Sequence, residues 1–410
     1  NACTVHGRQN TAGIVHLFNC DKVYGAMKTF KQSQTDPTFV QNPYPTYDAA
    51  RAMGDVVWWE DYAMPAAVSH RAVRMILSNR DLGREPLAPI ECPAHIVEWQ
   101  ANESHSMLEL EPPRHSRLRG LVLRAFTGRK VAAMAPEISA TCHRLIDAFP
   151  DHPFDFLDTF ARPLPVHVIA TLLGVPTDRC DDLLRWSNAM VAMYQSGRSY
   201  ETELAANQAT VDFTAFLNSY ITHRRVHPRE DLLSDLIAAE EAGEKLTGEE
   251  LISTCILLLN AGHEATVHTL GNAIKTLLPL TFRDVTPALV EEVLRYDPPL
   301  HVFTRHAYKD IDCFGLEIKK GQEVACVLAA ANRDPAFAEN PNRFDPTRKL
   351  SQHQSFGSGL HFCVGAPLAR LEISIGLQIL FDRCPNLQIS EAPRYADTYH
   401  FHGLTQLMVR

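Results

Sequence analysis

One cysteine near the C-terminus lies in the segment whose residue types and spacing best suit chemistry. The segment runs Phe356-Gly357-Ser358-Gly359-Leu360-His361-Phe362-Cys363-Val364-Gly365. Its glycines keep side-chain bulk low, and the following Ala366-Pro367 predicts a helix that has proline in its first turn. Backbone N–H groups at such a helix N-terminus stabilise a thiolate. The segment therefore predicts a thiolate at Cys363.

A thiolate held by backbone amides is what an axial haem ligand requires. The glycines would also let a flat cofactor approach the backbone. The alternative is a buried, inert cysteine beside a glycine turn, which is the usual explanation for an isolated cysteine. The full spacing favours the ligand, so we expect Cys363 to bind a metal, with Phe356, Gly357, His361 and Gly365 close to the cofactor.

A long apolar stretch in the middle of the chain predicts a central helix. Thr247 and Glu250 match a capping box, and the helix extends to about Leu278, before Pro279. Its centre reads Asn260-Ala261-Gly262-His263-Glu264-Ala265-Thr266. Glycine and a carboxylate are both costly inside a buried helix. They indicate either a close helix crossing with Glu264 ion-paired, or a ligand groove with an acid for proton transfer.

A Glu-x-x-Arg pair follows in the next helical stretch. Glu292 and Arg295 lie three residues apart, so they share a helix face and can form an ion pair. Such pairs are common on solvated surfaces, and the motif is weak by itself. A second arginine follows downstream within Pro341-Asn342-Arg343-Phe344. We expect Arg343 to complete a buried network with the pair.

In order and spacing, from about Pro43 to Arg410, these motifs resemble those of the cytochrome P-450 family. The family's cysteine loop is Phe-x-x-Gly-x-(His/Arg)-x-Cys-x-Gly, and its long-helix pattern is (Ala/Gly)-Gly-x-(Asp/Glu)-Thr. The cysteine-loop pattern and the Glu-x-x-Arg pair are met. The long-helix pattern is met at Ala261, Gly262 and Glu264 and fails at Ala265.

The resemblance implies the fold and the cofactor. The fold would be mainly α with a small β part, with the long central helix over the haem. The cofactor would be haem b (iron protoporphyrin IX), bound between that helix and the cysteine loop, with Cys363 as the iron ligand. The activity would be that of a soluble, bacterial-type monooxygenase, which inserts one oxygen atom of O2 into a small organic substrate.

The resemblance also assigns donors for the haem propionates. Glu111 to Arg119 resembles the family's Asp-Pro-Pro-x-His segment, with Glu in place of Asp. Within it, His115 and Arg119 lie four residues apart on one helix face. Arg305 and His361 match the remaining donors. Two buried carboxylates need such cationic partners, whereas an ordinary surface charge is the better explanation for Arg117.

Substrate contacts follow only from the resemblance. The stretch from Arg84 to Met107 corresponds to a variable pocket loop. Asn260, Ala261 and Ala265 would face the distal side of the haem, and Phe401 is the expected contact from the C-terminal turn. His301, four residues before Arg305, is either a pocket residue or a satisfied histidine outside the pocket. Asn260 and His301 indicate a polar group on the substrate.

Proton delivery is where the chain departs from the family. An acid–alcohol pair on the long helix usually supplies protons; here Glu264 is present, but Ala265 has no hydroxyl. Thr266 does not simply replace it, because the next helical residue points roughly 100° away. Three explanations stay open: a substrate group organises the water, ordered water bridges from Glu264, or coupling is poor or the reaction is not plain hydroxylation. We favour substrate- or water-assisted delivery.

The electron donor would be a ferredoxin or a flavodoxin with its reductase, because no reductase domain is present. A basic face near the cysteine loop, with Arg117, Arg124 and Arg370, would dock an acidic donor. Two other functions remain: a haem-thiolate peroxygenase that uses H2O2, or a non-catalytic haem-binding protein. Peroxygenases of this kind commonly have an arginine near the distal acid, and residues 258–268 include none. The intact Glu264 argues against a non-catalytic haem-binding protein.

The amino-acid composition limits the classes of protein to which the chain can belong. The 410 residues are 45% hydrophobic and 21% charged, and the net charge of −9 argues against nucleic acid as the main partner. The ten cysteines form no C-x-x-C pair, so free cytosolic thiols are expected. No stretch suggests a signal peptide or a membrane span, so we expect a cytoplasmic enzyme without an anchor.

One domain is expected over 37–410, after an irregular N-terminal segment over 1–36. Apolar periodicity predicts helices in the middle of the chain, for example over 131–149 and 154–173. Short strands are expected at 56–59 and 66–69, ahead of a helix over 71–78. Further strands are expected over 311–327 and at the C-terminus.

Overall fold

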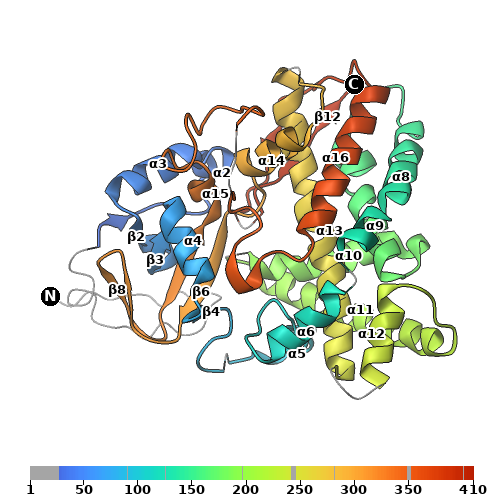
Figure 1. The fold of residues 1–410 in the computed structure, drawn as a ribbon, viewed down its shortest axis with the longest axis horizontal. Helices are drawn as coiled ribbons and strands as arrows, with labels where there is room; N and C mark the ends of the chain where they lie inside the picture. Colours follow the sequence, from blue (N-terminus) through green and yellow to red (C-terminus); the bar gives the residue numbers. More distant parts are fainter. Residues whose placement is uncertain are drawn as a thin grey trace.

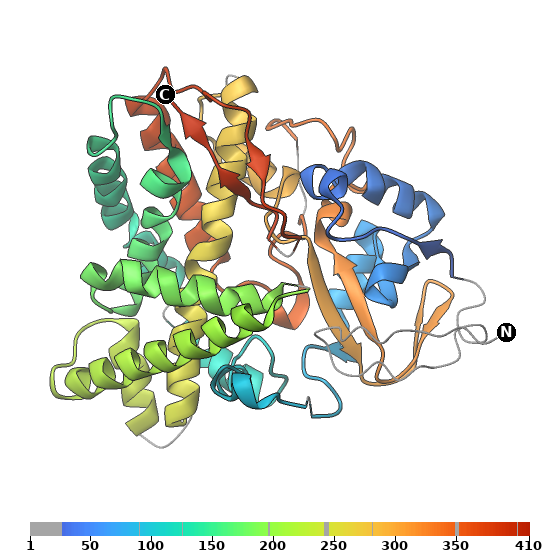
Figure 2. The ribbon, with the colours of Figure 1, turned by 180° about the vertical axis from the view of Figure 1, so that it is seen from behind.

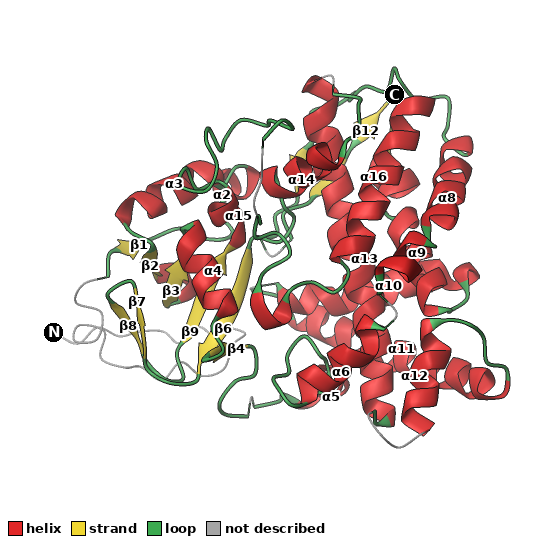
Figure 3. Cartoon of the chain, in the orientation of Figure 1, coloured by secondary structure: helices red, strands yellow, loops and turns green. Residues whose placement is uncertain are grey.

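The computed structural model describes residues 27–89, 91–124, 126–195, 197–241, 246–280, 282–348, 352–399 and 401–410. Helices make up the larger part, and most of the strands gather at the opposite end with the first helices of the chain (Figures 1 and 3). The expected fold, mainly α with a small β part, is confirmed. Among the described residues, no helix is long and apolar enough to cross a bilayer.

A six-stranded sheet forms the main β part, in the order β1-β2-β3-β9-β6-β4. Its strands are β1 Thr29–Phe30, β2 Val56–Trp59, β3 Met64–Ala67, β4 Leu82–Gly83, β6 Val302–Ala307 and β9 Glu323–Val327. One face packs on α4 (His70–Ser78), where Ile76 joins Val324 and Cys326. The other packs on α3 (Tyr44–Met53), where Tyr47 joins Ala325. Because both faces are covered, β9 is apolar almost throughout.

Helix α13 (Gly248–Leu280) crosses the centre of the helical part, beside α16 (Ala366–Arg383) (Figures 1 and 2). The predicted capping box is confirmed, because Thr247 N donates to Glu250 Oε2 at 3.1 Å and Glu250 N donates to Thr247 Oγ1 at 3.2 Å. The helix ends two residues later than predicted and includes Pro279.

The other helices surround this pair and join it to the sheet. They are α2 Pro37–Gln41, α5 Val97–Glu103, α6 Arg114–Leu123, α7 Gly128–Ala132, α8 Ala135–Asp147, α9 Pro163–Leu173, α10 Cys180–Val191, α11 Tyr200–Val226, α12 Leu232–Glu241, α14 Pro287–Tyr296 and α15 Leu328–Asn332. Small sheets pair β10 (Arg394–Tyr395) with β11 (Leu404–Gln406), β12 (Met408–Val409) with β5 (Phe154–Asp155), and β7 (Ile311–Cys313) with β8 (Leu316–Ile318).

Several predicted boundaries shift for local reasons. The strand expected at 66–69 ends at Ala67, because the Ser69 hydroxyl caps α4 by accepting from Ala72 N at 3.3 Å. The stretch 154–173 begins with β5 before it turns helical. Of the N-terminal segment expected to be irregular, 1–26 lies outside the described residues, and Thr29–Phe30 form β1 beside β2. The single domain over 37–410 stays a prediction.

Candidate active site

The cysteine loop runs into α16 and places Cys363 three residues before that helix begins. As predicted, α16 has a proline in its first turn. The loop closes on itself, because Cys363 N donates to Phe356 O at 3.0 Å. The Cys363 thiol accepts hydrogen bonds from the backbone N–H groups of Gly365 and Ala366. These amides are the donors that the sequence predicted for a thiolate.

Burial nevertheless raises the pKa of the Cys363 thiol above its usual value, and outweighs the lowering by the Gly365 and Ala366 amides and by Arg119 and Arg370. The amides therefore lower this pKa as expected of a helix N-terminus, but they do not offset the effect of burial. Cys363 is also exposed. A thiol that is surrounded by protein and still accessible faces an internal space. A metal ion there would supply the positive charge that a thiolate needs.

Gly357 and Gly359 were predicted to leave room for a flat cofactor, but the structure gives them backbone roles instead. Gly357 and Gly359 have φ of +67° and +72°, a region that favours glycine. A Cβ on Gly359 would lie 2.3 Å from the Leu77 carbonyl oxygen at the end of α4. Close packing on α4, as well as φ, therefore requires Gly359. Clearance for a cofactor does not explain it.

Basic side chains converge next to the loop, as the resemblance implied. The rings of His115 on α6 and His361 lie 4.3 Å apart between centroids. His361 Nε2 is 2.8 Å from Glu111 Oε1, and Arg119 donates to the Phe362 carbonyl at 2.6 Å. Arg305 on β6 is 3% exposed, and its one hydrogen bond within the described part of the chain is to the adjacent Thr304 carbonyl.

The basic side chains beside the cysteine loop outnumber the carboxylates that could pair with them. His115 is 1% exposed, and its Nδ1 has no hydrogen-bond partner among the described residues. Burial, together with the positive charges of His361 and Arg119, lowers the pKa of His115 to about 4. Burial alone would raise the pKa of Glu111, but its hydrogen bond to His361 lowers it. Two propionates would supply the missing negative charge, so these residues fit a haem.

Helix α13 is accessible along one stripe at its centre. Ala261 is exposed, although the helix around it is mostly buried. The partly exposed residues of this stretch are Leu257, Asn260, Gly262, Glu264, Ala265 and His268. The cysteine loop passes beside this part of α13 in both ribbon views (Figures 1 and 2). Ala261 and Ala265, which the resemblance places on the distal side of the haem, both lie on this stripe.

Thr266 lies off this stripe and is 6% exposed. Its side chain therefore points away from the accessible face of α13, where a hydroxyl would be needed to replace the one that Ala265 lacks. Gly262 also has a packing role: a Cβ there would lie 2.5 Å from Ile169 Cγ1 on α9. Close helix crossing, one of the two open alternatives, therefore explains the glycine.

Glu264 combines both alternatives, because it is ion-paired and still accessible. Its side chain is 18% exposed, with Oε1 3.3 Å from His268 Nε2 and Oε2 3.5 Å from His263 Nε2. Burial by itself would raise the pKa of Glu264. The hydrogen bond and charge of His268, with the charges of His263 and Arg162, bring it below the usual value instead. These neighbours therefore favour the ionised carboxylate of Glu264.

Of the three predicted substrate contacts, two are partly exposed and one is buried. Asn260 lies on the accessible stripe; its Nδ2 is 3.8 Å from Met190 Sδ, and its Oδ1 is buried without a partner among the described residues. Phe401 is partly exposed, with its ring 5.7 Å from that of His268. His301, by contrast, is fully buried, and its Nδ1 is 2.8 Å from the Tyr47 hydroxyl. His301 therefore does not lie on an accessible surface, although its Nε2 has no hydrogen-bond partner among the described residues.

His301 also belongs to a buried group with Asp297 and His402 whose ligand atoms lie within 4.8 Å of one another. The carboxylate of Asp297 is already engaged: Tyr44 donates to it at 2.7 Å, and Lys275 Nζ lies 3.7 Å away. A divalent cation would bring further positive charge beside this ammonium. The group therefore fits a hydrogen-bonded anchor for the C-terminal segment better than a metal centre.

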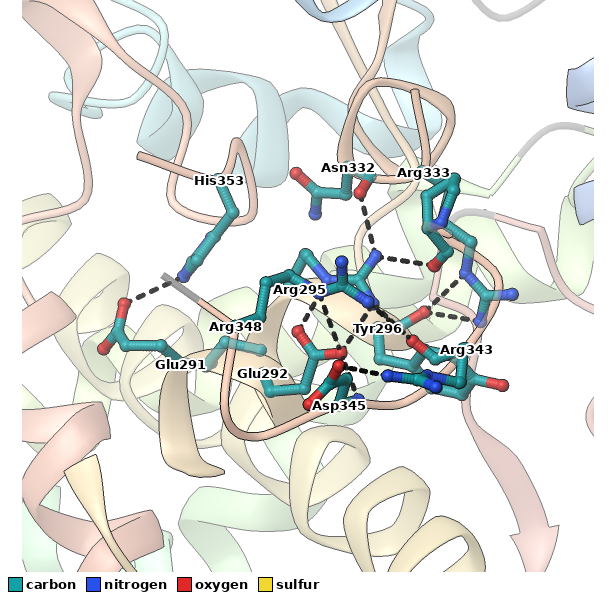
Figure 4. Close-up of polar contacts among 12 residues, drawn as sticks. Glu291, Glu292, Arg295, Tyr296, Asn332, Arg333, Arg343, Asp345, Arg348 and His353 are labelled. Atoms are coloured by element: carbon teal, nitrogen blue, oxygen red, sulfur yellow. Dashed lines mark hydrogen bonds and ion pairs between the residues drawn. The ribbon is translucent and has the colours of Figure 1, made fainter. Parts of the chain in front are cut away.

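The Glu-x-x-Arg pair is the centre of a buried network (Figure 4). Neither side chain is exposed, and Arg295 Nε and Nη2 donate to the two Glu292 oxygens at 2.7 Å each. Arg343 was predicted to close the network with its guanidinium, and this is wrong. That guanidinium is 70% exposed on Asp345, and Arg343 contributes only its carbonyl oxygen. Arg348 instead lies 3.6 Å from Glu292.

The predicted redox-partner face is less free than expected. Arg117 donates to both oxygens of Glu250, at 2.8 and 2.6 Å. Arg370 donates to Glu291 at 2.5 and 3.0 Å and lies over the Phe356 ring at 4.7 Å. Two of the three arginines therefore have structural partners, and sequence spacing did not reveal those partners. Arg124, at the end of α6, is exposed.

Comparison with known proteins places the chain in a family. A model of the family described as Cytochrome P450 matches residues 281–394. The biotin biosynthesis cytochrome P450 of Bacillus subtilis is 35% identical, over 93% of this chain and 99% of its own. The cytochrome P450 monooxygenase PikC of Streptomyces venezuelae is 36% identical, over 87% of each chain.

A solved structure agrees with these relatives. The crystal structure of P450BioI, in complex with an acyl carrier protein ligated to hexadec-9Z-enoic acid, superposes with a TM-score of 0.85. Its identity is 34%, over 91% of this chain and 99% of that one. The family uses haem, and its members are monooxygenases. This chain belongs to the cytochrome P450 family and is an oxidoreductase of the monooxygenase type.

Proposed function

We propose that the protein binds haem b through Cys363 and inserts one oxygen atom of O2 into a small organic substrate. In the net reaction RH, O2, two electrons and two protons give ROH and water. The bound haem would supply the oxygen chemistry. The observation that carries the proposal is the thiol of Cys363, held by the Gly365 and Ala366 amides and open to an internal space.

The chain's own residues would do the rest. The propionates would be held by His115, His361, Arg305 and Arg119. A propionate would give the buried His115 Nδ1 the hydrogen-bond partner that it lacks among the described residues. Phe356, Gly357 and Gly365 would shape the proximal side, and Ala261 the distal side. Asn260, which is partly exposed on the accessible stripe of α13, would border the substrate.

Proton delivery would pass through Glu264 without the usual hydroxyl. Glu264 is accessible and paired with histidines, whereas Ala265 offers no donor. We expect Ala265→Thr to leave the yield of product per electron pair nearly unchanged, because delivery does not depend on that position. A large rise in this yield with the native substrate would contradict the idea.

The electrons would come from a ferredoxin or a flavodoxin with its reductase. Arg124 is the best single test of the docking face, because Arg117 and Arg370 have ion-pair partners. We expect Arg124→Glu to slow reduction, with a stronger effect at low salt. Arg394→Glu, near the C-terminus, serves as the charge-matched control. An equal effect of both variants would count against this face.

The first test is the spectrum of the dithionite-reduced protein under carbon monoxide. We expect the red-shifted Soret band of thiolate-ligated haem, and its loss in Cys363→Ala. A histidine-type band in the wild type would refute the ligand. Assays with H2O2 in place of donor and O2 would separate the peroxygenase alternative, and haem binding without turnover with any donor would support the non-catalytic one.

A further inference from the structure

Helix α5 lies inside the predicted pocket loop and has no buried apolar residue of its own. Only Glu103 is buried in it, and Val97 is 51% exposed. The helix has seven residues, and a helix this short is not stable in water by itself. Burial and the charge of Glu109 raise the pKa of Glu103 to about 7, so burying the ionised carboxylate costs free energy. Contacts with other elements must therefore hold α5 in place.

A side chain from another helix caps the first turn of α5. The N-cap residue of α5 itself, Ile96, offers no side-chain acceptor. Instead Asn207 Oδ1, on α11, accepts from Glu98 N at 2.9 Å and from Trp99 N at 3.1 Å. Both amides belong to the first turn, whose N–H groups have no partner within a helix. The N-terminus of α5 thus depends on α11.

The other end of α5 is held by the short helical turn η5 (Ala192–Tyr194), which precedes α11. The hydroxyl of Tyr194 donates to Glu103 Oε2 at 2.8 Å. Just before α5, His95 Nε2 lies 2.6 Å from Glu203 Oε2 on α11. Polar side chains of α11 and of η5 therefore contact α5 at both of its ends.

Helix α5 also covers one end of the accessible stripe of α13. Ser253 Oγ donates to the Asn102 carbonyl oxygen at 2.9 Å. Ser253 comes four residues before Leu257 and seven before Asn260, so the three share one helix face. Ser253 is fully buried, whereas Leu257 and Asn260 are partly exposed. The accessible part of this face therefore begins where α5 stops covering it, and α5 borders the internal space.

We propose that α5 and α11 form a two-part lid over this space, and that Asn207 couples the two parts, so that α5 stays helical only while α11 is docked on it. The inference rests on the proposed function for what passes under the lid, a small organic substrate. When α11 moves away, both ends of α5 lose their partners and the helix unwinds into water, as expected of a segment with few buried apolar contacts. A ligand in the internal space favours the docked state, because it binds that state better.

Hydrogen–deuterium exchange of the haem-loaded full chain, followed by mass spectrometry of peptides that cover 97–106, tests the coupling. We expect the amides of α5 to exchange about fivefold faster in Asn207→Ala, which is the factor expected from the loss of one N-cap. Asn207→Asp keeps an acceptor oxygen and should retain the wild-type exchange rate. Asn218→Ala, at an exposed position of the same helix, is the matched control and should leave the exchange unchanged. Thermal unfolding would verify that each variant folds.

A second measurement tests whether α5 acts as a lid. Phenylimidazole changes the absorption spectrum of a haem protein when it binds, so its association and dissociation can be followed by stopped flow. We expect Asn207→Ala to raise both rate constants about fivefold and to leave the Kd nearly unchanged, because the same opening limits entry and exit. A structural defect within the site itself would change the Kd instead.

The outcomes separate the inference from the proposed function. Wild-type exchange of α5 in Asn207→Ala, or equally fast exchange in Asn207→Asp and Asn207→Ala, would refute the coupling. Faster exchange with unchanged phenylimidazole rate constants would refute the lid. If the wild type does not bind haem, the proposed function fails, and exchange of the haem-free chain then still decides whether Asn207 holds α5 in place.

Discussion

Removing Arg295 tests the energetic role of the Glu292–Arg295 network. Arg295 is fully buried and donates to both oxygens of Glu292, and to the Asn332 and Pro341 carbonyls at 3.0 and 2.9 Å. Arg295→Met leaves a buried carboxylate whose remaining partners are Asp345 N at 2.8 Å and Arg348 at 3.6 Å. We expect the free energy of unfolding to fall by about 3–5 kcal/mol, as for other broken buried ion pairs.

Equilibrium urea unfolding, followed by far-UV circular dichroism, would measure the change. Against a typical stability of about 5–15 kcal/mol, the loss is large and easily resolved. Arg343→Met is the matched control, because its guanidinium is 70% exposed, and we expect a change within about 0.5 kcal/mol.

The double variant Glu292→Leu/Arg295→Met gives the decisive comparison. It removes both charges, so it should cost less than the sum of the two single variants. Strict additivity, or an Arg295→Met loss no larger than that of Arg343→Met, would refute the assignment of the cost to an uncompensated buried charge.

Three further predictions concern the propionate donors and two glycines. In haem-free protein the His115 pKa is about 4 against an ordinary 6.5. As the pH falls, this histidine therefore takes up its proton at a higher pH in the unfolded chain than in the folded protein, and the free energy of unfolding should fall as pH drops from 6.5 toward 4. In His115→Gln, this dependence of the free energy of unfolding on pH should weaken. The same pH dependence in the variant and the wild type would contradict the assignment. Gly262→Ala should lower the melting temperature, since its Cβ lies 2.5 Å from Ile169. Ile169→Ala in the same chain should recover part of that loss, and two simply additive losses would exclude the helix contact as the cause. Gly359→Ala should destabilise more than Gly120→Ala in urea unfolding, because φ is +72° and the Leu77 carbonyl lies 2.3 Å away, whereas a Cβ on Gly120 meets nothing within 4 Å.

The sequence by itself determined the elements that local chemistry dictates. Thr247 and Glu250 cap α13 because a capping box satisfies its own donors locally. Proline at the start of α16 and the spacing around Cys363 placed the thiol beside backbone amides. The family resemblance rested on such short-range motifs, which is why the family assignment held along the chain.

Only the tertiary structure decided which residues from distant segments of the chain contact one another. His301 could not be separated from a pocket residue until Tyr47, from α3, was seen beside it. Arg343, Arg117 and Arg370 were assigned from charge and position, but the contacts of each depend on segments that fold against it. Likewise, Gly403 and His268 are 135 positions apart in the sequence, and only packing brings them together. Spacing along the chain specifies which residues share a helix face, whereas ion pairs and close approaches between elements depend on how those faces pack.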